Sequence, residues 1–227
     1  MGIIEMSNVY YDYPDGSRGL VNMSINVEKG ECLALVGPNG SGKTTVLLHL
    51  NGILTPREGS VSILGLQTNE DNLREVRSKV GVVFQNPDDQ LFSPTVFDDV
   101  AFGPLNIGFG QGEVQERVKK ALANVGMQGY ERRSSQHLSF GEKKRISIAT
   151  VLSTEPEILL LDEPTMGMDP WVKREFVSLL EELKKNHTTI IATHDEVLVG
   201  LCNRMVMLKD GRIADSDAWD ELQPNLL

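Results

Sequence analysis

The sequence predicts an α/β fold with a parallel-rich sheet. Short apolar runs that fit buried strands alternate with segments of helical periodicity. These runs are Cys32–Val36, Val80–Phe84, Ile158–Leu161, Thr188–Thr193 and Met205–Leu208. The first part of the chain instead alternates apolar and polar side chains, as in Val21–Val27, which is typical of an antiparallel strand. We therefore expect an N-terminal antiparallel β subdomain beside an α/β core.

Composition narrows the class of function. The chain has 227 residues, 40% of them hydrophobic, and this size fits one domain. Its net charge of −10 disfavours a nucleic-acid partner, which would need a basic face. No apolar run approaches the roughly 18 residues that span a bilayer, and the start does not resemble a signal peptide. Cys32 and Cys202 favour a reducing compartment, and we expect a protein that is soluble or joined to a membrane only through partners.

Residues 86–150 differ from the strand-rich remainder. We interpret them as a helical subdomain inserted into a single domain, 1–227, whose core is formed by 1–85 and 151–227. Another helix is expected to begin at Pro170, because proline is favoured at the first helical position. The apolar side chains at helical spacing in the inserted region are Val114, Val118, Leu122 and Val125.

The stretch Gly37–Thr44 fits the phosphate-binding pattern G-x-x-x-x-G-K-[ST]. Its glycines let backbone N–H groups converge on phosphate oxygens, and the following helix presents its positive end. Lys43 is expected to reach the β- and γ-phosphates of ATP, and Thr44 to help hold Mg²⁺. A chance glycine loop is the less favoured alternative, because a strand precedes the stretch and a helix follows it. The expected nucleotide contacts are Gly37, Asn39, Gly40, Ser41, Gly42, Lys43, Thr44 and Thr45.

Two carboxylates, Asp162 and Glu163, follow the buried run Ile158–Leu161. The carboxyl end of such a strand suits a ligand crevice. We expect Asp162 to hold the metal through water, and Glu163 to orient and polarise the attacking water as a general base. The alternative is a solvated acidic turn, which the phosphate loop makes the minority interpretation.

These motifs, in this order, resemble the ATP-binding subunits of ABC transporters, from Ile3 to about Leu222. Beside the phosphate loop and the Walker B run Ile158–Glu163, four further features carry the resemblance. They are Gln85 at the Q-loop position, the signature motif Leu138–Glu142, the D-loop residue Asp169 and the switch histidine His194.

The resemblance implies the ABC ATPase fold and hydrolysis of Mg·ATP by two chains that close on nucleotide. Lys43, Gln85, Glu163 and His194 are then catalytic, and Gln85 joins Thr44 and Asp162 around the metal. Ser139, Gly141 and Asp169 contact nucleotide. Tyr13 is the expected adenine-stacking aromatic, with Tyr11 as the alternative.

The signature motif departs from the family pattern in two places. Phe140 replaces the usual second glycine, and Glu142 replaces the usual glutamine. Ser139 and Glu142 fit a capping box, yet Gly141 costs the helix about 1 kcal/mol relative to alanine. We hypothesise that this helix end, with N–H groups left unsatisfied, serves the ATP of another chain. Gly141 then allows close approach to the γ-phosphate, and Phe140 packs locally or on the partner.

The D-loop also departs from the family pattern. It reads Met166-Gly-Met-Asp169 rather than the common small-residue version. Asp169 itself is kept, so we expect this departure to affect the dimer face rather than the assignment.

A narrower resemblance joins the chain to the energy-coupling-factor branch, especially cobalt- and nickel-uptake ATPases. It rests on Gln85–Thr95, Asp98–Gly103 and the spelling Ser139–Arg145. It implies a transmembrane subunit docked near Asp88–Phe92, although a plain Asn-Pro-Asp turn fits this stretch as well. Chains of this branch are often longer at the C-terminus, so we expect a weak resting dimer.

The predicted function is thus an ATPase subunit of a membrane importer for cobalt, nickel or a vitamin. Its partners are a second copy or a paralogous ATPase and the transmembrane subunit, and its place is the cytoplasmic face of the cell membrane. The alternative is a soluble ABC ATPase that acts on nucleic acid or ribosomes. Such proteins usually carry two cassettes or a long coiled-coil insertion. A P-loop kinase or GTPase would lack Gln85, Leu138–Glu142 and His194.

Overall fold

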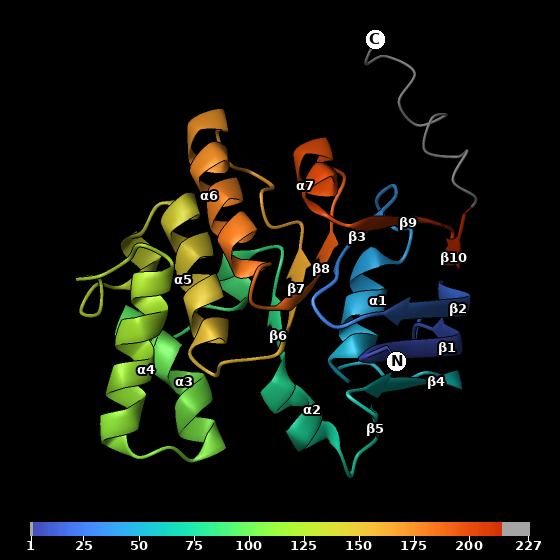
Figure 1. Cartoon of the computed structure of the whole chain (residues 1–227), viewed down its shortest axis with the longest axis horizontal. Coiled ribbons are helices and arrows are strands. Elements are labelled where there is room, and N and C mark those ends of the chain that lie inside the picture. Colours follow the sequence, from blue (N-terminus) through green and yellow to red (C-terminus); the bar gives the residue numbers. More distant parts are fainter. Residues whose placement is uncertain (1, 215–227) are drawn as a thin grey trace. The chain divides into compact units, whose positions relative to one another are not determined.

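A computed structural model describes residues 2–214 (Figure 1). The chain divides into two compact units. The first consists of Met1–Arg77 and Thr188–Leu227, and the second of Ser78–His187. The predicted helical region 86–150 falls wholly within the second unit. The end of the family resemblance, residues 215–222, lies outside the described residues.

An antiparallel sheet forms the N-terminal part of the first unit, as the alternation of side chains predicted. Its strands are β1 (Ile4–Asp12), β2 (Arg18–Val27), β4 (Glu58–Ile63) and β5 (Leu66–Gln67). Their order is β2-β1-β4-β5, and all three pairings are antiparallel. Along β2, Val21, Met23 and Ile25 are buried while the residues between them are exposed.

Four strands of the other sheet belong to the first unit, in the order β10-β9-β3-β8. They are β3 (Cys32–Val36), β8 (Thr188–Ala192), β9 (Arg204–Lys209) and β10 (Arg212–Ile213). Strand β10 pairs antiparallel with β9, whereas β3 runs parallel to both β8 and β9. Every residue of β3 and β8 is buried, as expected for strands covered on both faces.

Three helices and one tight turn complete the description of the first unit. Helices α1 (Lys43–Leu50) and α7 (Glu196–Leu201) belong to this unit, and α2 (Leu73–Lys79) begins in it. The turn between β9 and β10 has φ values of 52° at Asp210 and 73° at Gly211. Two positive φ values suit a two-residue hairpin, so the predicted turn is present.

Two parallel strands and four helices make up the second unit (Figure 1). Strands β6 (Val80–Val83) and β7 (Ile158–Asp162) pair directly. Helices α3 (Val96–Ile107), α4 (Gln111–Asn124) and α5 (Phe140–Leu152) lie side by side, and α6 (Pro170–Leu183) follows β7. Short 3₁₀ turns span Pro87–Asp89 and Ser135–His137.

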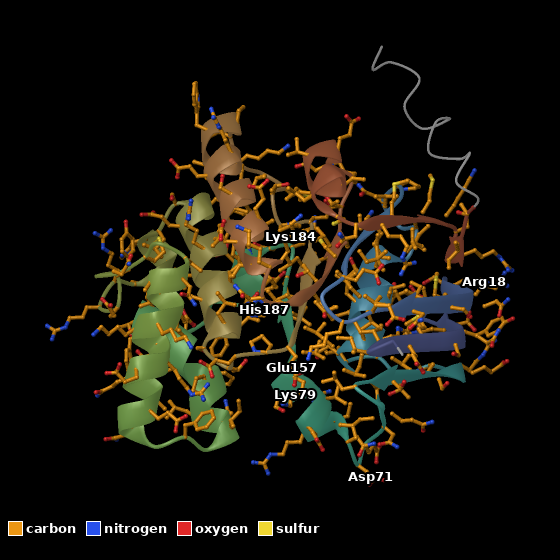
Figure 2. All side chains as sticks on the ribbon, in the orientation of Figure 1. Arg18, Asp71, Lys79, Glu157, Lys184 and His187 are labelled. Carbon is orange, nitrogen blue, oxygen red and sulfur yellow. The ribbon has the colours of Figure 1, made fainter. Side chains whose placement is uncertain are left out.

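The ends of β6 and β7 are fixed by specific polar contacts. At their start, the Glu157 N–H donates to the Lys79 carbonyl over 2.9 Å, and the two side chains form an ion pair at 3.0 Å (Figure 2). At the other end, β6 stops at Val83 rather than at the predicted Phe84. The Phe84 N–H donates to the Gln90 side chain over 3.1 Å, which takes this residue out of the strand ladder.

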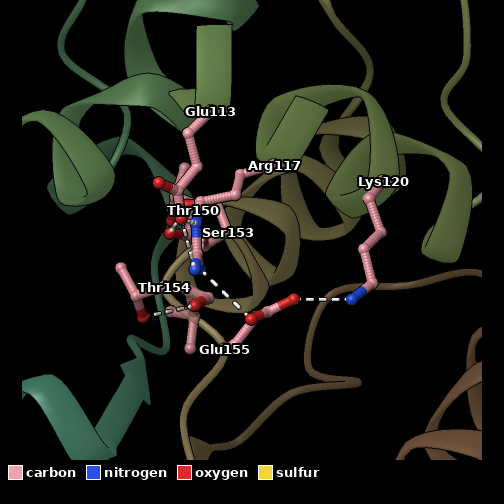
Figure 3. Close-up of polar contacts among 8 residues, drawn as sticks. Glu113, Arg117, Lys120, Thr150, Ser153, Thr154 and Glu155 are labelled. Carbon is pink, nitrogen blue, oxygen red and sulfur yellow. Dashed lines mark hydrogen bonds and ion pairs between the residues drawn. The ribbon is translucent and has the colours of Figure 1, made fainter. Parts of the chain in front are cut away.

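Helix α4 is joined to the turn after α5 by a charged cluster (Figure 3). Glu155 pairs with Lys120 at 2.5 Å and with Arg117 at 3.3 Å, and Arg117 also pairs with Glu113 at 2.9 Å. The Lys120 hydrogen bond, followed by Arg117, holds the pKa of Glu155 below its ordinary value. Exposed ion pairs contribute little individually to the free energy of unfolding. The main effect of the cluster is therefore to align α4 with the end of α5.

The two cysteines stand 170 residues apart in the sequence and meet in the first unit. Their sulfur atoms lie 2.9 Å apart. The Asn203 N–H donates to the Cys32 carbonyl over 2.8 Å, and this bond brings Cys202 to the start of β3. Within residues 2–214, the helices are all too short or too polar to cross a membrane.

Candidate functional site

The phosphate loop connects β3 to α1, where the sequence predicted it. Gly37, Gly40 and Gly42 have φ values of 149°, 78° and 106°, which favour glycine. A Cβ on Gly37 would lie 2.2 Å from the Leu208 carbonyl oxygen, so the close passage of β9 also requires glycine there.

The positive end of α1 is left uncompensated by its own side chains. Gly42 at the N-cap offers no capping side chain, and the first turn has no acidic residue. Such a helix end favours an anion. In residues 2–214, the buried Ser41 hydroxyl oxygen also has no hydrogen-bond partner, while Gly40 has open space where its Cβ would be. These features fit a phosphate chain.

Lys43 points its ammonium group back along the loop. It is only 6% exposed, and Nζ donates to the carbonyl oxygens of Gly37 at 2.8 Å and Pro38 at 3.3 Å. The lysine charge is therefore held within the loop that would receive phosphate.

Both candidate stacking residues contact α1, but Tyr13 contacts its first turn, next to the phosphate loop, and Tyr11 contacts His49 in its last turn. The Tyr13 hydroxyl forms a 2.7 Å hydrogen bond with the Thr45 hydroxyl. Tyr11 instead packs edge-on against His49, with ring centroids 4.8 Å apart. His49 is fully buried, and burial lowers its pKa. This geometry favours Tyr13 over Tyr11 for contact with nucleotide.

His194 lies at the same sheet edge of the first unit as the phosphate loop. It is exposed and stands two residues after β8 ends. The preceding Thr193 N–H donates to the Leu35 carbonyl over 2.9 Å, which fixes the exit of β8 beside that of β3. The Asp195 side chain then caps α7.

The two predicted carboxylates lie at the carboxyl end of β7 in the second unit. Asp162 ends the strand with 4% exposure, and Glu163 is 6% exposed. Glu163 has φ 40°, a strained conformation for a residue other than glycine. Among residues 2–214, no three His, Cys, Asp or Glu side chains gather into a metal cluster. A strand end with the two carboxylates Asp162 and Glu163 suits Mg²⁺, which takes one or two carboxylates and completes its coordination shell with phosphates and water.

Gln85 and Asp169 contact elements of the second unit that the sequence did not connect with them. The exposed Gln85 donates from Nε2 to the Met166 sulfur over 2.9 Å. The Asp169 side chain accepts from the N–H groups of Trp171 and Val172, so it is the N-cap of α6. Pro170 begins that helix as predicted.

The signature helix α5 begins with the predicted capping box. The Glu142 N–H donates to the Ser139 hydroxyl at 3.4 Å, and the Glu142 carboxylate accepts from the Ser139 N–H at 2.8 Å. The Tyr130 hydroxyl also donates to Glu142 over 2.8 Å. These bonds, led by that from the Ser139 N–H, hold the pKa of Glu142 below its ordinary value. The capping box satisfies the Glu142 N–H as the sequence predicted, and the service of this helix end to the ATP of another chain stays a prediction.

Local packing accounts for two residues of the signature motif, Gly141 and Phe140. A Cβ on Gly141 would lie 2.7 Å from the Val172 side chain, so glycine lets α6 lie this close to α5. A Cβ on Gly167 would lie 3.3 Å from the Phe140 ring. Phe140 thus packs against the D-loop of its own chain, one of the two arrangements expected.

Lys144 is the residue that the sequence analysis missed. It is fully buried, and Nζ donates to the carbonyl oxygens of Phe84 at 3.3 Å and Glu163 at 3.5 Å. Burial lowers the pKa of Lys144 to about 8, and the carboxylates of Asp162 and Glu163 oppose this shift. The available signal was its spacing, because Lys144 shares a helical face with Ile148 and Val151.

The family follows from sequence comparison. The family model described as ABC transporter matches residues 20–166. The chain therefore belongs to the ABC transporter family and is an ATPase of that family. Its resemblance to the energy-coupling-factor branch is confirmed by its relatives.

Two of these relatives are called energy-coupling factor transporter ATP-binding protein EcfA. The protein from Methanothermobacter thermautotrophicus is 49% identical over 215 residues, which cover 93% of this chain and 69% of the relative. The protein from Methanocaldococcus jannaschii is 49% identical over 217 residues, with coverage of 94% and 78%.

Solved structures confirm the ABC ATPase fold. CbiO1 from Clostridium perfringens, part of the ABC transporter complex CbiONQ, has a TM-score of 0.85 and 36% identity, covering 98% of this chain and 92% of its own. An ATP-binding cassette solved as a dimer in a post-hydrolysis state with ADP and Pi has a TM-score of 0.84 and 28% identity, with coverage of 93% and 97%.

The Tyr13 geometry predicts which tyrosine binds adenine. Stacking of a base on an aromatic ring is worth about 1–3 kcal/mol, so Tyr13→Ala should weaken ATP binding roughly 5- to 150-fold. Tyr13→Phe keeps the aromatic ring and should lose less ATP affinity than Tyr13→Ala. Tyr11→Ala should change the ATP affinity by less than about threefold. Isothermal titration calorimetry with ATP measures all three. Equal losses for Tyr11→Ala and Tyr13→Ala would refute the assignment.

Proposed function

We propose that the chain is the ATP-hydrolysing subunit of a membrane importer of the energy-coupling-factor type. The observation that carries the proposal is the phosphate loop, whose uncapped helix end, glycine conformations and buried lysine suit ATP. The names of the relatives support coupling to transport. The proposed cargo is a transition-metal ion, cobalt or nickel, or a vitamin. This choice rests on the resemblance of Gln85–Thr95 to the energy-coupling-factor branch.

Each motif of the sequence has a role in this proposal. Lys43 holds the β- and γ-phosphates, and Thr44, Gln85 and Asp162 hold Mg²⁺. The metal, when bound, neutralises charge that develops on the phosphates. Glu163 accepts a proton from the attacking water as general base, and His194 binds near the γ-phosphate.

The nucleotide also binds a second chain, either another copy or a paralogous ATPase. Ser139, Gly141 and Asp169 of one chain contact ATP held by the phosphate loop of the other. The dimeric state of a solved cassette with 28% identity supports this arrangement. ATP then acts as a ligand that stabilises the dimer, and its hydrolysis releases the two chains.

Glu163→Gln tests this proposal. The amide cannot accept the water proton, so kcat should fall about 100- to 10,000-fold, while ATP still binds and closes the dimer. Size-exclusion chromatography with light scattering in ATP should show a stable dimer for Glu163→Gln. The exposed Glu181→Gln on α6 is the matched control and should behave as wild type. A Glu163→Gln chain that stays monomeric at high concentration in ATP would count against the sandwich.

The segment Asp88–Phe92 is the proposed dock for the transmembrane subunit. Phe92 is 67% exposed and packs edge-on against Phe102, which is 51% exposed, with ring centroids 5.0 Å apart. Asp88 and Asp89 are exposed in the same segment, and Asp88 pairs with Lys143 of α5 at 2.6 Å. A basic, apolar helix end complements such a surface in charge and polarity.

Buried Asp99 holds this segment in place. It is 3% exposed, and its carboxylate accepts from the N–H groups of Phe92 at 3.0 Å and Ser93 at 2.8 Å. Its other oxygen accepts from the Ser135 hydroxyl at 2.6 Å. The apolar surface is therefore presented by an ordered loop, which lowers the entropic cost of docking.

Charge reversal separates docking from catalysis. The double variant Asp88→Lys/Asp89→Lys should hydrolyse ATP within about twofold of wild type. Neither carboxylate contacts a proposed catalytic group, and the ion pair that is lost, between Lys143 and the 62% exposed Asp88 side chain, is of the kind that contributes little to stability. Its co-purification with the transmembrane subunit should fall several-fold through lost charge complementarity. Glu181→Lys/Glu182→Lys, on exposed α6, is the matched control. Unchanged recovery of the complex by the first variant would place the dock elsewhere.

A further inference from the structure

Lys144 has no part in the proposed reaction, yet it is among the largest fully buried side chains of the chain. We propose that Lys144 is a positioning residue that couples the signature helix α5 to Glu163 and to the Q-loop of its own chain. The inference rests on the proposed function, because it assumes that α5 senses the partner's ATP and that Glu163 acts on water.

A single ammonium group links the ends of both strands of the second unit. Nζ of Lys144 donates to the carbonyl of Phe84, the residue before Gln85, and to the carbonyl of Glu163. Hydrogen bonds from a charged donor are stronger than neutral ones. A shift of α5 would therefore move the backbone of Glu163 and the backbone at Phe84, which leads directly into Gln85.

A second contact joins α5 to the same residue, Phe84, at the end of β6. The Gln90 side chain accepts from the Phe84 N–H at 3.1 Å and donates to the Ser147 carbonyl and the Thr150 hydroxyl of α5, both at 2.8 Å. Phe84 is thus bonded through its N–H to Gln90, which α5 holds, and through its carbonyl to Lys144 of α5. The Q-loop begins from a point fixed to the signature helix.

The first turn of α5 is joined to the D-loop as well. Phe140 packs over Gly167, and Gln85 reaches the neighbouring Met166. The Lys144 ammonium lies 5.9 Å from the Phe140 ring centroid. The capping box at Ser139 stands little more than one helical turn from Lys144, so contact at the helix end and the ammonium belong to one rigid element.

The choice of lysine at this position argues against simple core packing. Lys144 shares its helical face with Ile148 and Val151, which are buried apolar residues. Methionine would fill similar space without the cost of removing an ammonium from water. The ammonium group instead donates to the Glu163 carbonyl, and this bond can hold the backbone of the catalytic residue in place.

Lys144→Met tests the inference, with Lys144→Arg as the conservative variant. Misplacement of a catalytic group by about 1 Å can cost 100-fold in rate, so kcat of Lys144→Met should fall about 10- to 100-fold. ATP affinity and the ATP-dependent dimer should stay within about twofold of wild type, because the phosphate loop and the capping box are unchanged. Lys144→Arg keeps the positive charge, and its kcat should be at least fivefold higher than that of Lys144→Met. Lys119→Met, on an exposed face of α4, is the matched control and should retain wild-type kcat.

Three results would overturn the inference. The first is a kcat of Lys144→Met within twofold of the wild-type kcat. The second is a loss of ATP affinity and of ATP-dependent dimer in Lys144→Met as large as its loss of kcat. The third is a kcat of Lys144→Arg no higher than that of Lys144→Met. Should Lys144→Met fail to fold, Lys144→Gln is judged by the same ratio of kcat loss to dimer loss. A wild-type chain without ATPase activity or ATP-dependent dimer would instead refute the proposed function itself.

Discussion

The phosphate loop depends on a helix end that its own chain does not neutralise. Gly42 provides no capping side chain, and the first turn of α1 has no carboxylate. The buried strands β3 and β8 hold the loop and His194 at one edge of their sheet. The close approach of β9 fixes Gly37. The first unit thus gives up one stabilising cap, worth about 1 kcal/mol, and presents a site for a polyphosphate.

The second unit follows the opposite arrangement at the start of α5. Glu142 caps this helix and accepts three donors, from the Ser139 N–H, the Ser139 hydroxyl and the Tyr130 hydroxyl. A carboxylate at this end offsets part of the positive potential of the helix. The signature helix is therefore a weaker anion site than α1 in a single chain. In the proposed function, this helix end contributes to ATP binding only when two chains close on the nucleotide, so ATP stabilises the dimer.

Local patterns in the sequence predicted most of the fold and the motifs of the site. Alternation in β2, the buried run of β3, Pro170 at the start of α6 and the capping box at Ser139 all depend on neighbours in sequence. The link from Lys144 to Phe84 and Glu163 was not predictable in this way, because it joins three distant segments. The same holds for Phe140 on Gly167 and for Gly141 against Val172. A buried lysine also looks like a solvated one until the helical face it shares with Ile148 is known to be covered.

The central claim is that the signature helix of one chain serves the ATP of another, and complementation between two inactive chains tests it directly. Ser139→Arg blocks the signature, and Lys43→Ala removes the charge that holds the phosphates. Each variant alone should be inactive, because every site in its homodimer lacks one half. A mixed dimer joins an intact loop to an intact signature and should recover ATP hydrolysis at one site. A mixture as inactive as either parent, with mixed dimers shown to form by differential tagging, would contradict the claim and leave Leu138–Glu142 as a helix cap only.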